Sequence, residues 1–194
     1  MKNITAFYFF SLIFFTGFSQ SKELALEEYE VINEVISPFE KNIPIPLDSI
    51  FLNNKFIVLG VNHFKAENIN EETFKFLWNN GDIKGQPPIE LFFKNFNLSH
   101  LKSDIIKSQS DSIINFKSLK GYFHSSNEAF IKNNPKHKYL SISKPFFNCN
   151  KDWCFIVKSQ YIPYTSTGGN GVMYIYVKVD DLWVLYNTID LWLT

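Results

Sequence analysis

The only two cysteines of the chain, Cys149 and Cys154, lie close together in the segment FNCNKDWCF. Strand-like apolar runs flank the pair, and the four residues between the cysteines, NKDW, are typical of a hairpin loop. Residues on either side of such a loop face each other across the ladder, at a separation that a disulfide can span. For a chain exported to an oxidising compartment, we therefore predict a Cys149–Cys154 disulfide that holds the register of the two strands.

Metal binding and redox chemistry fit this pair less well. A zinc site would need two more ligands, and the four histidines stand apart in the sequence, at His63, His100, His124 and His137. A thioredoxin-like site has two residues between its cysteines, whereas this pair has four, inside an expected hairpin. Zinc and redox readings therefore stay as minor alternatives, and we expect no cofactor and no metal.

A second candidate for chemistry is the segment QYIPYTSTGGNGVMYIY, residues 160–176, which is rich in tyrosine and in hydroxyl side chains. Such rings combine apolar area with a polar group and are common in binding surfaces. The GGNG run precedes an expected strand and not a helix, so it indicates a hairpin loop and not a phosphate cradle. We expect this segment to bind a small molecule, a glycan or another protein, through Tyr161, Tyr164, Tyr174 and Tyr176.

His124 and Glu128 offer an alternative, because they lie four residues apart at the start of an expected helix. This spacing could place both side chains on one helix face, as metal ligands or as a general acid with its orienting carboxylate. A hydrolase-like enzyme with a pocket near His124 and Glu128 therefore stays open. A third alternative is a structural, envelope-associated protein, which should show an exposed apolar patch. Because no nucleophile elbow or metal signature is present, we expect a non-catalytic binding or interaction domain.

Charge limits the classes of partner. The chain has 19 basic and 19 acidic residues, so its formal net charge is zero, and every basic residue is a lysine. Without arginine the chain lacks the bidentate side chain that reads guanine and grips phosphate. Without a basic excess it also lacks the electrostatic footprint of a nucleic-acid-binding protein. We therefore expect no nucleic-acid partner.

The first residues indicate export. Lys2 precedes an uncharged apolar run at residues 4–18, and small residues follow at the spacing that signal peptidase recognises, which predicts cleavage after Ser19. The run is shorter than the roughly 20 residues of a spanning helix and has no basic cluster behind it. We expect a signal peptide at 1–19, a periplasmic or extracellular location, no membrane span after cleavage, and one domain at 20–194.

The fold class follows from the order of the patterns. Apolar spacing and capping residues predict helices at 22–36, 70–80, 98–109 and 125–134, and residues 87–96 fit a helix or an extended segment equally well. β-branched and alternating runs predict strands at 54–64, 111–119, 139–148, 154–162, 171–179 and 182–189. The face of 171–179 that carries Met173, Ile175, Val177 and Val179 should belong to the core. We expect an α+β fold whose helices pack on one face of a largely antiparallel sheet that ends in a four-stranded C-terminal meander, with Asp180-Asp181 as a two-residue turn.

Several motifs of the last third occur in a fixed order: SISKPFF, TGGNG before a strand, DDLWVLYN and a closing LWL, with EEYEVIN near the mature start. This order resembles that of small exported bacterial proteins with no assigned activity. In those proteins a Ser-x-Pro-Phe strand, a glycine-rich turn and a tryptophan of the last hairpin recur. The resemblance implies a structural domain, and it implies no substrate and no catalytic residue.

Overall fold

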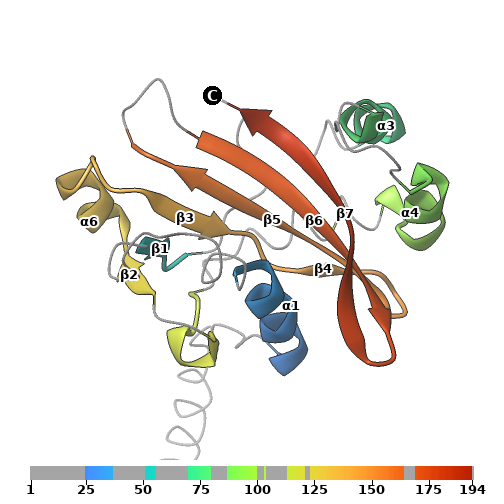
Figure 1. Ribbon diagram of the computed structural model, residues 1–194, viewed down its shortest axis with the longest axis horizontal. Helices are drawn as coiled ribbons and strands as arrows, with labels where there is room; N and C mark the ends of the chain where they lie inside the picture. Colours follow the sequence, from blue (N-terminus) through green and yellow to red (C-terminus); the bar gives the residue numbers. More distant parts are fainter. Residues whose placement is uncertain are drawn as a thin grey trace, which may run out of the picture.

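The computed structural model describes residues 25–36, 51–55, 70–79, 87–99, 103, 113–120, 123–163 and 169–193. These residues form an α+β fold with four α-helices and a seven-stranded mixed sheet (Figure 1). The helices are α1 (Leu26–Ile36), α3 (Glu71–Asn79), α4 (Ile89–Asn95) and α6 (Glu128–Asn133). The strands are β1 (Phe51–Asn53), β2 (His124–Ser126), β3 (Tyr139–Ile142), β4 (Phe146–Phe147), β5 (Trp153–Tyr161), β6 (Gly169–Val179) and β7 (Leu182–Leu193).

Local signals place the helices. The side chain of Asn70 accepts a hydrogen bond from the Thr73 amide at 2.9 Å, and Asn127 caps α6 by accepting from the Phe130 amide at 2.8 Å. The predicted helix at 70–80 is thereby confirmed. The ambiguous segment 87–96 contains α4, which begins after Pro88. The predicted helix at 98–109 and the predicted strand at 54–64 lie mostly outside the described residues.

The sheet is less antiparallel than the sequence predicts. Strands β5, β6 and β7 pair antiparallel in chain order, whereas β1 pairs parallel with both β2 and β3. The strand predicted at 139–148 is divided into β3 and β4, and both pair antiparallel with β5. The strand predicted at 111–119 is wrong, because this segment holds a 3-10 helix, Phe116–Ser118, preceded by an isolated bridge between Ile113 and Lys55.

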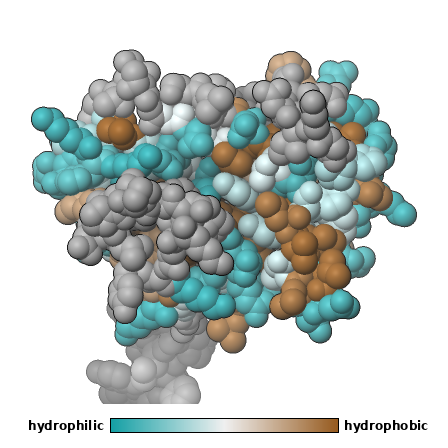
Figure 2. Space-filling model, viewed as in Figure 1, coloured by the Kyte–Doolittle hydropathy of each residue, from teal (hydrophilic) through white to brown (hydrophobic). Residues whose placement is uncertain are grey.

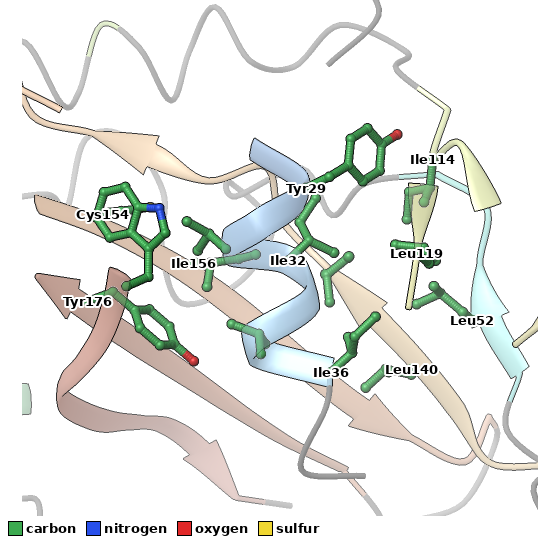
Figure 3. Close-up of a cluster of buried hydrophobic side chains, with 14 residues drawn as sticks. Tyr29, Ile32, Ile36, Leu52, Ile114, Leu119, Leu140, Cys154, Ile156 and Tyr176 are labelled. Carbon is green, nitrogen blue, oxygen red and sulfur yellow. The ribbon is translucent and has the colours of Figure 1, made fainter. Parts of the chain in front are cut away.

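Helices cover both faces of the central strands, which corrects the expectation of a single covered face. Side chains alternate along β5, so Phe155 and Val157 pack with α3 and α4, while Cys154 and Ile156 pack with α1. Figure 3 shows the side chains of α1 packed with those of the strands beneath it. Around β5 and β6 the sheet is therefore the middle of three layers, with α1 on one face and α3 and α4 on the other.

The hairpin of β6 and β7 extends past the rest of the sheet. Strand β5 pairs with β6 only as far as Val177, whereas β6 and β7 continue to pair up to Val179 and Leu182. Asp180 and Asp181 close the hairpin with φ angles of 48° and 62°. Two consecutive residues with positive φ define the type I′ turn that suits the twist of a hairpin, so the predicted two-residue turn is confirmed.

The predicted disulfide is wrong: Cys149 and Cys154 are both free. The hairpin turn begins at Asn148, two residues earlier than expected, because the Asn148 side-chain oxygen accepts from the amides of Asp152 and Trp153, each at 3.1 Å. Strand pairing therefore places Phe147, and not Cys149, opposite Cys154. Cys149 lies exposed in the turn, while Cys154 is buried in the cluster under α1.

Candidate functional site

The tyrosines expected to bind together lie on two different faces of the sheet. Tyr174 and Tyr176 pair with Ile156 and Cys154, on the face that α1 covers. Tyr161 pairs with Tyr139 across β3 and β5, on the opposite face, with ring centroids 5.9 Å apart. Tyr164 lies outside the described residues. The structure therefore does not bring Tyr161 together with Tyr174 and Tyr176.

A lysine that the sequence analysis did not single out lies beside Tyr174. Lys158 is only 7% exposed, and its Nζ atom donates to the backbone carbonyl of Val35 at 3.2 Å and lies 4.4 Å from the ring centroid of Tyr174. Burial lowers the pKa of Lys158 to about 8. Val35 lies in the last turn of α1, whose free carbonyl groups attract a cation. Lys158 therefore stabilises the carboxyl end of α1.

The phenol groups of this face are less acidic than usual. Burial raises the pKa of Tyr176, and burial followed by the nearby Asp190 carboxylate raises the pKa of Tyr174. Tyr176 is 4% exposed and belongs to the cluster under α1. Tyr176 thus acts in the core, and only Tyr174 of this pair retains partial exposure.

Aromatic and imidazole rings gather around Phe51 at the other end of the sheet. The ring centroid of Phe51 lies 4.9 Å from that of His137, 5.1 Å from Phe130, 5.5 Å from His124 and 5.9 Å from Tyr139. The two imidazoles are exposed, the two phenylalanine rings are half-buried and Tyr139 is buried. We call these five residues the Phe51 cluster. It offers ring faces and edges to a partner.

Lysines border the Phe51 cluster. Lys132 lies on α6, and Lys136 and Lys138 flank His137 in the chain, all three exposed. Within the described ranges no ion pair involves these three lysines. The acidic neighbour Glu128 is paired with Lys55, at 3.9 Å between Nζ and Oε1. The surface around the Phe51 cluster therefore carries uncompensated positive charge.

His124 and Glu128 do not share a helix face. His124 begins strand β2 and contacts Phe51, whereas Glu128 is the first residue of α6 and pairs with Lys55. The helix expected from 125 starts three residues later, because Asn127 provides the cap. The geometry assumed for the hydrolase-like alternative, two ligands on one helix, is thus absent at these residues.

The projecting hairpin carries exposed apolar side chains. Val179, Leu182 and Val184 are 48%, 70% and 47% exposed. Val177 pairs with Val184 and Val179 pairs with Leu182, so these side chains share the face on which α3 and α4 pack further along the sheet. We call Val179, Leu182 and Val184 the hairpin patch. Figure 2 shows apolar side chains gathered over this hairpin. The expectation that Val179 belongs to the core is wrong, since the helices end before they reach it.

The end of the hairpin is acidic, and an ion pair connects its base to α1. Asp180 and Asp181 are exposed, and no ion pair among the described residues involves either of them. On the other face Glu27 of α1 binds Lys151 and Lys178, at 3.2 Å and 3.3 Å. Burial alone would raise the pKa of Glu27, but the hydrogen bonds from these two lysines outweigh it and lower the pKa. The hairpin thus presents an apolar face and, at its end, two carboxylates without an ion-pair partner among the described residues.

Polar groups along β7 add to this picture. Three of the buried groups that lack a hydrogen-bond partner in the described part of the chain lie on this strand: Trp183 Nε1, the Tyr186 hydroxyl and Asn187 Nδ2. A buried donor without an acceptor costs roughly 1–3 kcal/mol.

Comparison of the chain with protein-family models, with curated proteins and with solved structures finds no match. The resemblance of its motifs to small exported bacterial proteins therefore stays a prediction. None of the helices in the described ranges combines the length and the apolar character needed to cross a bilayer. In the same ranges no three His, Cys, Asp or Glu side chains come together as metal ligands would.

The sequence analysis missed both surface features for identifiable reasons. The Phe51 cluster draws its rings from β1, β2, α6, β3 and the segment before β3, so no local motif marks it. The hairpin patch has the alternation of an ordinary half-buried strand, and alternation does not tell where the covering helices end. A usable signal was the pair Asp180-Asp181, which places a tight turn, and hence a protruding end, directly beside Leu182.

Proposed function

We propose that the protein is an exported, non-catalytic interaction domain that contacts another protein surface through the β6–β7 hairpin. The observation that carries this proposal is the hairpin patch, three large apolar side chains with about half or more of their area exposed on one projecting face. Single exposed apolar residues are ordinary, whereas neighbouring exposed apolar side chains on one projecting element are typical of a contact surface. Export is supported by the apolar run at residues 4–18 and the small residues that follow it.

Energetics define the kind of partner that fits. Covering the exposed parts of Val179, Leu182 and Val184 should contribute about 1 kcal/mol for each side chain. Association costs at least roughly 4 kcal/mol in lost translational and rotational freedom. The patch alone therefore does not hold a partner, and further contacts are needed. The adjacent Asp180 and Asp181 supply them if the partner is both apolar and basic.

The structural, envelope-associated alternative makes use of the same observation, since it also requires an exposed apolar patch. The two alternatives differ only in the role of the contact. An interaction domain uses it to recognise a partner, whereas a structural protein uses it to hold an assembly together. Nothing in the described residues favours the hydrolase-like alternative, since Glu128 faces Lys55 and His124 belongs to another element. A contact role of the hairpin is therefore the feature to test first.

Site-specific photo-crosslinking in the exporting cell tests the proposal. A photoreactive amino acid replaces Leu182 in one version and Phe76 in the control, because Phe76 is an apolar side chain of α3 that is 66% exposed. We expect a discrete crosslinked protein species from position 182 that Val184→Asp reduces severalfold, and none from position 76. Equal crosslinking from both positions, or none from position 182, would overturn the proposed contact role.

A further inference from the structure

We propose that the partner of the hairpin is a second copy of this chain, and that the hairpin patch with Asp180 and Asp181 docks on the Phe51 cluster and its lysines. This inference rests on the proposed function, because it takes the hairpin as the contact surface. It goes further by naming both the partner and the residues that receive the hairpin.

Charge complementarity carries the choice of partner. The chain is neutral overall, with 19 basic and 19 acidic residues, and two groups of opposite charge lie at separate places in the fold. Asp180 and Asp181 lie exposed at the end of the hairpin, and Lys132, Lys136 and Lys138 lie exposed around the Phe51 cluster. Neither group has an ion-pair partner in the described part of the chain. Two carboxylates on one copy can therefore pair with lysines of another.

The apolar parts of the two surfaces also correspond. The hairpin patch offers branched aliphatic side chains, and the Phe51 cluster offers the half-buried rings of Phe51 and Phe130 between two exposed imidazoles. Aliphatic groups pack well on aromatic rings that are already fixed by their neighbours. Lys132, Lys136 and Lys138 neighbour these rings in the chain and are exposed, so they can supply the polar rim that usually surrounds the apolar centre of a protein interface.

Sheet topology makes the contact intermolecular. The strand order β2-β1-β3-β5-β6-β7 places β1 and β2, which carry part of the Phe51 cluster, at the other end of the sheet from the β6–β7 hairpin, and Figure 1 shows these strands far apart. At about 4.8 Å between neighbouring strands, the five spacings separate the two edges by roughly 24 Å. The hairpin of one copy therefore cannot reach the Phe51 cluster of the same copy. A contact between two different surfaces leaves a free hairpin at one end and a free Phe51 cluster at the other, so copies add head to tail.

Charge reversal on each surface separately gives a sharp test by sedimentation velocity. The tip variant is Asp180→Lys with Asp181→Lys, and Lys151 at φ 56° shows that this chain already holds a lysine in the backbone conformation of the turn. The edge variant is Lys136→Glu with Lys138→Glu. The control variant is Lys94→Glu with Lys117→Glu, which changes the net charge by the same amount as the edge variant, at exposed positions that belong to neither surface. Far-ultraviolet circular dichroism checks that every variant is folded.

We expect wild-type protein and the control to associate in a concentration-dependent manner that salt weakens. Each reversed variant should associate about tenfold more weakly or worse, because like charges replace attractive pairs. A mixture of the tip and edge variants should regain association, since the intact tip meets the intact edge and the reversed tip meets the reversed edge. A chain that carries both reversals should regain association.

Three results would overturn the inference: a wild-type chain that is monomeric at every concentration, association that neither reversal changes, or a mixture that does not regain association. The failure of this inference is distinguishable from that of the proposed function. Position 182 would still crosslink to a different protein in the exporting cell if only the choice of partner were wrong. If the contact role itself were wrong, position 182 would crosslink to nothing.

Discussion

Replacing Lys158 by methionine should remove a pH dependence of stability that the buried ammonium imposes on the folded chain. The side chain of Lys158 is 7% exposed, and burial lowers its pKa from 10.5 to about 8. Below pH 8 the lysine is charged in the folded and in the unfolded chain, so the folded chain bears the full desolvation cost. Between pH 8 and 10.5 the folded chain releases the proton while the unfolded chain keeps it. Stability therefore rises with pH across this window.

The size of the effect follows from the two pKa values. The difference between about 8 and 10.5 corresponds to about 3 kcal/mol in the free energy of unfolding, fully gained above pH 10.5. Methionine has a similar length and no charge, so the Lys158→Met chain should lack this gain. It loses the hydrogen bond to the Val35 carbonyl, which costs roughly 1 kcal/mol at every pH.

Urea unfolding followed by tryptophan fluorescence, from pH 7 to pH 10.5, measures the difference. The free energy of unfolding of the wild-type chain minus that of Lys158→Met should rise by about 3 kcal/mol over this range. Titration of the tyrosines that Lys158 does not contact contributes to both chains and cancels in the subtraction. Lys94→Met, at an exposed position on α4, serves as the matched control. If this difference stays constant with pH, or falls, burial does not lower the pKa of Lys158 in the folded chain.

Three further predictions concern the β4–β5 turn and the base of the hairpin. Alkylation of the folded chain followed by mass spectrometry should modify Cys149 alone, because Cys154 is buried and burial raises its pKa; a chain that yields no free thiol after unfolding would contradict this. Asn148→Ala should lower the free energy of unfolding by about 2 kcal/mol in urea, since two amides lose their acceptor. An unchanged midpoint would show that the turn forms without this side chain. Glu27→Gln should cost up to about 1 kcal/mol at neutral pH, because two lysines lose a charged partner. The wild-type advantage should vanish as the pH falls through the lowered pKa of Glu27, and a cost that persists in acid would point to packing instead.

Elements set by local chemistry could be predicted from the sequence. The caps Asn70 and Asn127 act within three residues of themselves, so two helices follow from adjacent side chains. The Asp180-Asp181 turn is equally local. The α+β class and the antiparallel pairing of β5, β6 and β7 follow from turns of this kind.

Register and distant pairing could not be predicted. The segment FNCNKDWCF contains no large apolar residue from 148 to 152, so the sequence allows the turn to begin at either asparagine. The side chain of Asn148 decides it, and a shift of two residues separates the cysteines. The parallel pairing of β1 with β2 and β3 joins residues more than 70 positions apart, which no local pattern encodes.

The candidate surfaces could not be predicted from the sequence, for a related reason. The tyrosines of residues 160–176 were grouped because they are close in sequence, yet Tyr161 and Tyr174 lie on opposite faces of the sheet. Exposure of the hairpin patch depends on where α3 and α4 stop, and the position of His124 beside Phe51 depends on a parallel strand pair. Each of these is a property of the assembled layers and not of a motif.

Hydrogen–deuterium exchange of the wild-type chain at low and at high protein concentration tests the contact most directly. We expect backbone amides of residues 178–184 and of residues 132–138 to exchange more slowly at high concentration, together and in the same concentration range, while amides of α3 and α4 do not change. Exchange that is independent of concentration in both segments, or slowed only outside them, would contradict it.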